Sequence, residues 1–336
     1  MYTVPSASDR ETIAAQGRHR RLIAAAGTSG DTGKVDVVHF LSLRDWGAAR
    51  TLQTLDRADE LARLWKLQRM PQALRGKRVA LWFYGDGFRN RLAFELGAKE
   101  LGASIAYVPG ELGVHEPIED VVGYLENWFE MLVLRAKRHE DLLGVAARSR
   151  IPVINARTDR SHPCEILGDL LYIRRRFVNL AGLRVVFVGE PSNLCMSWVE
   201  AAAVLPIGVI QVCPPGYEIS EPILKGLQRN AAGEIRVTHE LDAALVDADV
   251  IYTDCWPRAA TAEERAGIRK DFLPYQIGER HLSALGEDGI FLPCPPVTRG
   301  EEVSSEAMLS PRCQNHAAKD NLLHVQNAIM EALVAG

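Results

Sequence analysis

The sequence has no apolar run long enough to cross a membrane, and no basic segment followed by an apolar stretch near its start. Positive charge is not in excess either: the net charge is −4, so we expect no nucleic-acid partner. The 6 cysteines show no C-x-x-C pair and no metal-ligand spacing, which is typical of reduced thiols. These absences predict a soluble cytoplasmic protein with no disulfides, no metal, no cofactor and no membrane partner.

Apolar residues, in contrast, are plentiful at 47% of the chain, enough for the cores of two domains. From Val35 onward, short apolar runs alternate with helical patterns, which favours parallel sheets joined by crossover helices. The sequence therefore predicts an α/β fold: two doubly wound parallel-sheet domains joined by interdomain helices. The runs lie at 78–84, 103–109, 131–136 and 151–156 in a first series, and at 183–189, 208–214, 234–239, 248–254 and 289–295 in a second.

The domain boundaries follow from these two series. Residues 1–34 are polar and turn-rich and are expected to form an N-terminal arm. The first domain is predicted over 35–162 and the second over 163–316, with an amphipathic helix over about 163–177 at their junction. The remaining segment, 317–336, is predicted as a C-terminal helix that packs back on the first domain.

Polar residues gather immediately after the predicted strands. In open parallel sheets, ligands bind outside the carboxyl ends of the strands, so these residues are the candidate site. Together they can polarise a carbonyl and hold an anion. They are Gly85 to Arg91, Arg135, Thr158 to Glu165, Glu190 to Asn193, Asp254 to Arg258 and Cys294 to Arg299.

The segments that contain these residues carry recognisable motifs. They read LRGKRVALWFYGDGFRNRLAFELGAKELGA (74–103), NARTDRSHPCEILGDLL (155–171), GEPSNLCMS (189–197), ADVIYTDCWPR (248–258) and FLPCPPVTRGEEV (291–303). In this order they resemble the S-T-R-T-R, H-P-x-Q, G-D-x-N-N, T-D-x-W and H-C-L-P blocks of the aspartate/ornithine carbamoyltransferase family. The resemblance is closest to the ornithine branch and covers residues 38–334.

This resemblance implies a transferase that moves a carbamoyl group from carbamoyl phosphate to the amine of an amino acid. It also implies a homotrimer with active sites at subunit interfaces, and small molecules as substrates. The implied site residues are Gly87, Phe88, Arg89 and Asn90 for the phosphate, Arg135 and His162 for the carbonyl oxygen, Asp254 and Cys294 for the attacking amine, and Asn193 for the amino-acid part of the acceptor.

The sequence departs from the family mainly where the donor binds. The S-T-R-T-R loop reads Gly87-Phe88-Arg89-Asn90-Arg91, which removes hydroxyl donors. The Gln of H-P-x-Q is Glu165, and the late Arg after A-E-N is Leu322. Since hydrogen bonds to charged groups are worth about 1.5–3 kcal/mol each, these changes predict weaker binding of an ordinary donor. On the acceptor side, Arg258 replaces a Ser and can pair with a carboxylate or a phosphate.

We therefore predict a divergent carbamoyltransferase-type enzyme for an unusual amino-acid-like acceptor or a modified donor, in specialised metabolism. One alternative is different chemistry on another anionic or phosphorylated ligand, with Glu165 as an acid/base whose pKa is raised by burial. Another is a non-catalytic paralogue that binds a metabolite. Taken singly, each residue also has a structural interpretation: Cys294 as a small buried hydrophobe, Asp254 as a helix cap, Arg89 as a surface charge.

Overall fold

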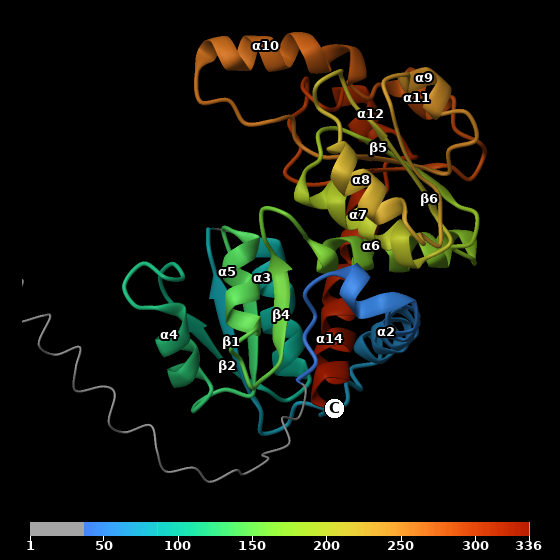
Figure 1. Cartoon of the computed structure of the whole chain (residues 1–336). Coiled ribbons are helices and arrows are strands. Elements are labelled where there is room, and N and C mark those ends of the chain that lie inside the picture. The colour runs from blue at the N-terminus through green and yellow to red at the C-terminus, as the bar shows by residue number, and fades with distance from the viewer. Residues whose placement is uncertain (1–36, 86, 336) are drawn as a thin grey trace, which may run out of the picture. The chain divides into compact units, whose positions relative to one another are not determined.

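A computed structural model describes residues 37–85 and 87–335, so the predicted N-terminal arm (1–34) lies outside the described residues. These residues form two parallel sheets with helices packed around them (Figure 1). The first sheet has the strand order β2-β1-β3-β4, and the second has the order β7-β6-β5-β8-β9. The predicted fold class, two doubly wound parallel sheets, is confirmed.

The strands of the first sheet pair in parallel, and the register of β3 against β4 shifts between Leu134 and Arg135. The inner strands are almost continuously buried, because helices cover both faces of a sheet of this kind. At the edge, β2 exposes several of its residues. The bounds are β1 (Arg78–Phe83), β2 (Ser104–Val108), β3 (Met131–Arg135) and β4 (Val153–Arg157).

The second sheet is built in the same way. Its central strand β5 and the adjacent strand β8 are buried over nearly every residue. Each strand lies inside the apolar run that predicts it, with ends that differ by a residue or two. The bounds are β5 (Arg184–Val188), β6 (Gly208–Val212), β7 (Ile235–Thr238), β8 (Val250–Thr253) and β9 (Ile290–Pro293).

Helices connect successive strands in both sheets. The larger ones are α2 (Leu43–Lys66), α3 (Phe88–Glu100), α6 (Pro163–Phe177), α7 (Asn193–Val204), α10 (Ala262–Phe272) and α14 (Asn321–Val334). The shorter ones are α4 (Ile118–Leu125), α5 (His139–Ala146), α8 (Glu221–Gln228), α9 (Leu241–Ala244), η2 (Leu273–Tyr275), α11 (Glu279–Ser283), α12 (Ser305–Leu309) and α13 (Asn315–Lys319).

Helix α6 is the predicted junction helix. It begins at Pro163, where the fixed backbone angle of proline suits the first turn, and its first half is buried throughout. It contacts α2, α7, α13 and α14, so it lies against elements from both ends of the chain (Figure 1). The predicted C-terminal helix is interrupted at Asp320, which separates α13 from α14. Helix α14 packs on α2, α3 and α6.

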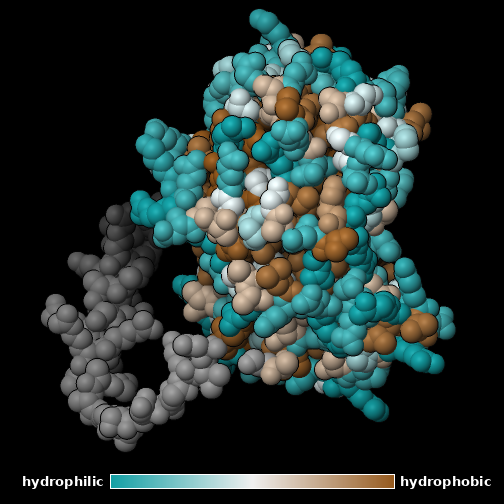
Figure 2. Space-filling view, turned by 90° about the vertical axis from the view of Figure 1, so that its right-hand side faces the viewer, coloured by the Kyte–Doolittle hydropathy of each residue, from teal (hydrophilic) through white to brown (hydrophobic). Residues whose placement is uncertain are grey.

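The main hydrophobic core runs through α2, α6, α7, α14 and strands of both sheets. Within it, Tyr252 of β8 lies between Phe187, at a ring-centroid distance of 5.7 Å, and Trp198, at 5.4 Å. This packing fixes the Tyr252 ring so that its hydroxyl reaches α6. On the face shown in Figure 2, hydrophilic and hydrophobic residues are mixed. No helix among the described residues has the length and apolar character needed to span a bilayer.

Candidate active site

The carboxyl ends of the two sheets meet at the start of α6. His162 is the N-cap residue of α6, and its backbone N–H donates to Ser197 Oγ of α7 at 2.8 Å. Nearby, Asn193 Nδ2 of α7 donates to the backbone oxygen of Thr158, just after β4, at 2.6 Å. These bonds join the end of the first sheet to the first helix of the second sheet. Thr158, His162 and Asn193, which follow predicted strands, are thereby brought together.

The donor loop depends on the absence of a side chain at Gly87. Its φ is +30°, and a Cβ there would lie 2.7 Å from Arg135 Cζ. Glycine therefore lets the Arg135 guanidinium pass directly over the loop. The Nε of Arg135 donates to the backbone oxygen of Tyr84 at 3.2 Å, which holds the side chain at the end of β1.

The start of α3 offers groups that suit an anion. The N–H of Arg91 makes the first backbone bond of this helix, to Gly87 O at 3.1 Å, so earlier N–H groups of the turn have no helical partner. Arg89 is exposed, and its Cζ lies 4.6 Å from the ring centroid of Phe88, which is itself 52% exposed. Arg89 and Phe88 thus stand at the solvent side of the loop.

Asn90 belongs to the predicted phosphate loop, but its side chain is bound to other elements of the fold. Its side chain is buried, its Nδ2 donates to Ala156 O at 2.6 Å, and its Oδ1 accepts from Gln326 Nε2 at 2.6 Å. Both ends of the amide are therefore used to tie α3 to β4 and α14. Those hydrogen bonds leave the backbone N–H of Asn90, and not its side chain, for a phosphate; that Asn90 contributes to phosphate binding stays a prediction.

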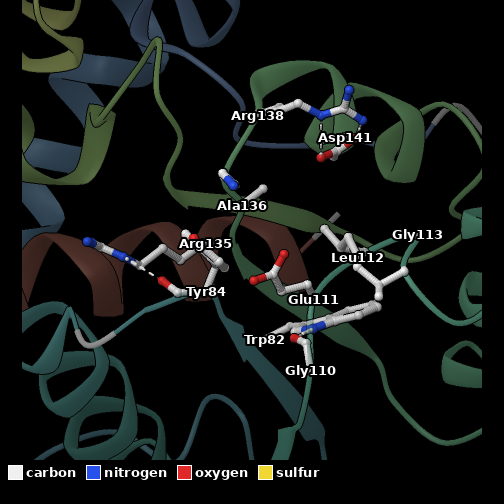
Figure 3. A pocket seen from close by; sticks show the side chains of 12 residues that line it. Trp82, Tyr84, Gly110, Glu111, Leu112, Gly113, Arg135, Ala136, Arg138 and Asp141 are labelled. Carbon is white, nitrogen blue, oxygen red and sulfur yellow. Dashed lines mark hydrogen bonds and ion pairs between the residues drawn. The ribbon is translucent and has the colours of Figure 1, made fainter. Parts of the chain in front are cut away.

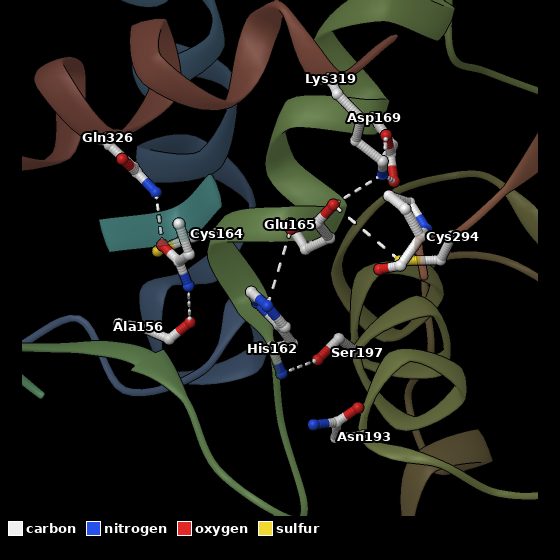
Figure 4. A network of polar contacts seen from close by, with 12 residues as sticks. Ala156, His162, Cys164, Glu165, Asp169, Asn193, Ser197, Cys294, Lys319 and Gln326 are labelled. Atoms are coloured by element: carbon white, nitrogen blue, oxygen red, sulfur yellow. Dashed lines mark hydrogen bonds and ion pairs between the residues drawn. The ribbon is translucent and has the colours of Figure 1, made fainter. Parts of the chain in front are cut away.

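His162, Glu165 and Cys294 form the centre of the site (Figure 4). Glu165 Oε2 lies 3.6 Å from His162 Nε2, and Glu165 Oε1 lies 4.0 Å from Cys294 Sγ. Burial lowers the pKa of His162 to about 3, so the imidazole is neutral at pH 7. Burial also raises the pKa of the Cys294 thiol, which stays protonated. The site thus presents a neutral imidazole and a thiol beside a carboxylate.

Sequence reasoning missed Lys319, at the end of α13. Its Nζ lies 2.7 Å from Glu165 Oε1 and 2.9 Å from both carboxylate oxygens of Asp169 (Figure 4). Tyr252 Oη donates to Asp169 Oδ2 at 2.9 Å. The available signal was weak: Lys319 stands among other polar residues, three positions before Leu322.

Lys319 decides the charge of Glu165. Although burial acts to raise the pKa of Glu165, the positive charge of Lys319 and the hydrogen bond from its ammonium group act to lower it, and the pKa is lowered overall. This direction does not favour the alternative in which Glu165 is an acid/base with a raised pKa. Asp169 takes the opposite course, since burial raises its pKa to about 6 despite Lys319. Of the two carboxylates, Glu165 is the one that stays ionised to lower pH.

Asp254 directly follows β8. Its Oδ1 accepts from the Cys255 N–H at 2.8 Å, and burial raises its pKa while Arg157 acts to lower it. Arg157, at the end of β4, was not predicted as a site residue. Its charge is coupled to those of Asp254, Arg258 and Cys294, and no hydrogen bond holds its guanidinium among the residues that the structure describes. Arg258 itself is exposed.

A cavity of about 300 Å³ lies beside Arg135 (Figure 3). The loop Gly110 to Val114 and the side chains of Trp82 and Tyr84 form part of its wall. Lys137 and Arg138 add positive charge, and Arg138 pairs with Asp141. In Figure 3 the Arg135 guanidinium turns towards the Tyr84 oxygen, away from Glu111. The cavity thus adjoins the donor loop through Tyr84 and Arg135.

Family models match nearly all of the described chain. The aspartate/ornithine carbamoyltransferase carbamoyl-P binding domain matches residues 38–175, and the Asp/Orn binding domain of the same family matches residues 181–333. The chain belongs to the aspartate/ornithine carbamoyltransferase family. The predicted resemblance is confirmed over both halves.

Individual relatives agree with this family. The ornithine carbamoyltransferase of Chlorobaculum tepidum is 37% identical over 264 residues, 78% of each chain. That of Methanothermobacter thermautotrophicus is 34% identical and covers 88% of this chain and 98% of its own. Among solved structures, the Pyrococcus furiosus ornithine carbamoyltransferase has a TM-score of 0.85 at 31% identity, covering 89% of this chain and 97% of its own.

Proposed function

We propose that this carbamoyltransferase-family protein transfers a carbamoyl group, from carbamoyl phosphate or a modified donor, to the amine of an unusual amino-acid-like acceptor. One observation carries the proposal: Glu165 lies 3.6 Å from His162 and 4.0 Å from Cys294, where the carboxyl ends of both sheets meet. The anion-binding start of α3 and Arg135 lie on one side of this centre, and Asp254 lies on the other.

The geometry suits attack on a carbonyl carbon. The amine nitrogen forms a bond to that carbon and charge collects on the carbonyl oxygen. The bond to the phosphate oxygen then breaks, and the proton that the amine loses leaves with the phosphate. The Arg135 guanidinium and a neutral His162 N–H are suited to donate to the carbonyl oxygen as its charge grows. Arg89 and the free N–H groups of α3 are suited to hold the phosphate. Cys294, as a thiol, and Asp254 stand where the amine would be oriented.

The acceptor is proposed to differ from ornithine because of the charges near Asp254. Arg157 and Arg258 interact electrostatically with each other, Arg157 also interacts with Asp254, and neither guanidinium donates a hydrogen bond among the described residues. Two guanidinium groups disfavour a second ammonium group on the acceptor and favour a carboxylate or a phosphate. Asn193 and Arg258 are the proposed contacts to the body of the acceptor.

Assembly, location and domain limits belong to the same proposal. Helix α3 exposes Phe88, Leu92 and Leu96 in one stripe at successive turns, at 52%, 43% and 49%. Tyr107, on the edge strand β2, is 48% exposed. Contact with further copies of the chain, as in a homotrimer with active sites at the interfaces, would cover this face. A cytoplasmic location, and domains over 35–162 and 163–316, stay predictions.

The first test is ligand-induced stabilisation. A ligand that binds only the folded protein must raise its melting temperature, so carbamoyl phosphate at about millimolar concentration should produce a clear shift. Turnover is then measured as formation of a ureido product with a panel of amino acids, including amino diacids and ornithine. The expected result is a product with an acceptor that carries an extra anionic group.

Matched variants separate a catalytic role from damage to the fold. His162→Ala and Cys294→Ala should abolish product formation, whereas His316→Ala, which changes an exposed histidine, and Cys313→Ala, outside the site, should not. No melting shift with carbamoyl phosphate and no product with any amine would contradict the proposal and favour a non-catalytic metabolite-binding role.

A further inference from the structure

The cluster around Lys319 combines one cation with two carboxylates in a nearly dry environment. The side chains of Lys319, Glu165 and Asp169 are 15%, 9% and 1% exposed. Buried charges are stable only when they are paired and hydrogen-bonded, and here each carboxylate contacts the same ammonium group. Burying these three charges costs free energy. Because the cluster lies beside His162 and Cys294, we expect it to serve the site.

The backbone explains how Lys319 reaches Glu165. A Cβ on Gly168 of α6 would lie 3.3 Å from the backbone of Leu322, so α6 and the start of α14 approach each other closely. Leu322 uses this approach to enter the core, with 4% exposure. Lys319, one turn earlier and across the break at Asp320, is then directed towards the first turns of α6. Lys319 therefore brings a positive charge into the site. It stands three residues before Leu322, the position at which the resemblance leads us to expect arginine.

We propose that Lys319 is a positioning residue: by binding Glu165 Oε1 and Asp169, it keeps the Glu165 carboxylate ionised and fixed, so that Glu165 accepts N–H groups from the ligand and selects a transferred group that carries an NH2. This inference rests on the proposed carbamoyl transfer and names the chemistry that its donor must show. Oε2, which faces His162 without a bond at hydrogen-bond distance, is the oxygen left for the ligand.

The charges around Glu165 favour an ionised carboxylate, which accepts hydrogen bonds, over a protonated one, which could donate one. Lys319 and Arg89 are positive, His162 is neutral, and Cys294 and Tyr252 are protonated. Asp169, with a pKa raised to about 6, shares Lys319, and the more distant Asp254 also acts on Glu165. An ionised carboxylate has only acceptor sites, so a carbamoyl NH2 is bound there, whereas the methyl group of an acetyl phosphate gains nothing.

The experiment compares binding of carbamoyl phosphate and acetyl phosphate, because their ratio isolates the NH2 group. Dissociation constants are measured by titration calorimetry between pH 6 and 8.5. The wild-type protein should bind carbamoyl phosphate at least about tenfold more tightly, at a ratio that does not change with pH, since a charge-assisted hydrogen bond is worth roughly that factor. Glu165→Gln should keep most of this preference, because the Gln oxygen also accepts.

Lys319→Met should behave differently. Without the ammonium group, two buried carboxylates face each other, and one takes up a proton near neutral pH. The preference for carbamoyl phosphate should fall to about one at pH 6 and recover in part as pH rises. The double variant Lys319→Met/Glu165→Gln should again show no pH dependence, and Lys270→Met, at an exposed site, should match the wild type. A folded Lys319→Met protein with an unchanged ratio at every pH overturns the inference.

Failure of the proposed function would look different. If the wild-type protein binds neither phosphate compound, carbamoyl transfer is rejected, and the role of Lys319 is read from melting temperature against pH. Lys319→Met must then change the shape of that curve between pH 5 and 8, while Lys270→Met must not; identical curves reject the positioning role too.

If Lys319→Met does not fold, Lys319→Arg takes its place. Arginine keeps the charge, so it should retain the pH-independent ratio, and loss of that ratio counts against the inference.

Discussion

The absence of a side chain at Gly87 leaves room for the Arg135 guanidinium beside the donor loop. Gly87→Ala introduces a Cβ 2.7 Å from Arg135 Cζ and should push the guanidinium away from the donor site. Since one hydrogen bond to a charged group is worth about 1.5–3 kcal/mol, we expect carbamoyl phosphate affinity to fall by roughly one order of magnitude or more. Titration calorimetry measures this loss.

The control for this change is Gly85→Ala. Gly85 also has a positive φ, +67°, but its Cβ would meet no atom within 4 Å. It therefore introduces similar backbone strain without moving Arg135. Equal losses of affinity in the two variants would show that strain, not displacement of Arg135, weakens binding.

Glu200 provides a pH test behind the site. Its Oε2 accepts from Ser161 Oγ at 3.4 Å, and burial raises its pKa from 4.5 to about 7. The folded protein thus binds more protons than the unfolded chain between these values. Its free energy of unfolding falls as pH rises through that window, so the stability from a protonated Glu200 is present below pH 4.5 and lost near 7.

Glu200→Gln should remove this loss, because an amide keeps an acceptor for Ser161 and has no charge to bury. At pH 8 the variant should be more stable than the wild type by about 3 kcal/mol, and near pH 5 the two should be similar. Urea unfolding at both pH values measures the difference. A constant difference at the two pH values would contradict the raised pKa.

The residues that sequence could and could not predict differ in one physical respect. Arg135, Cys294 and Asp254 follow apolar runs directly, so a rule about strand ends is enough to find them. The charge of Glu165 depends instead on Lys319, far away in the chain, and only the approach of α6 to α14 reveals it. The Asn90 side chain turned out to be structural for the same reason, since its partner Gln326 also lies on α14.

At the scale of elements, the strands were predictable because buried parallel strands are almost continuously apolar. The C-terminal break was not, because Asp320 has ordinary helical angles and carries no glycine or proline signal. The contact of α3 with α14 could not be predicted from the sequence pattern either. It depends on Gly97, where a Cβ would come within 1.9 Å of Asn327 Oδ1.

This contact between helices is itself testable. Gly97→Ala should force α3 away from α14 and lower the free energy of unfolding by about 1–3 kcal/mol, a typical cost of overpacking. Asn327→Ala makes room, so the double variant Gly97→Ala/Asn327→Ala should lose less than the sum of the two single changes. Additive losses in urea unfolding would show that Asn327 is not what the new methyl group meets.

For the whole molecule, the exposed stripe of α3 makes assembly measurable. Leu92→Glu/Leu96→Glu places two charges in the face proposed to contact another copy, and burying them unpaired is too costly for the contact to survive. Light scattering should show a mass of three times 37.1 kDa for the wild type and of one chain for the variant. Leu52→Glu, at a leucine of α2 that is 42% exposed, should leave the mass unchanged. Because α3 begins at the donor loop, the dissociated variant should also bind carbamoyl phosphate more weakly. A wild-type mass of a single chain would reject the homotrimer while leaving the chemistry of each site to its own tests.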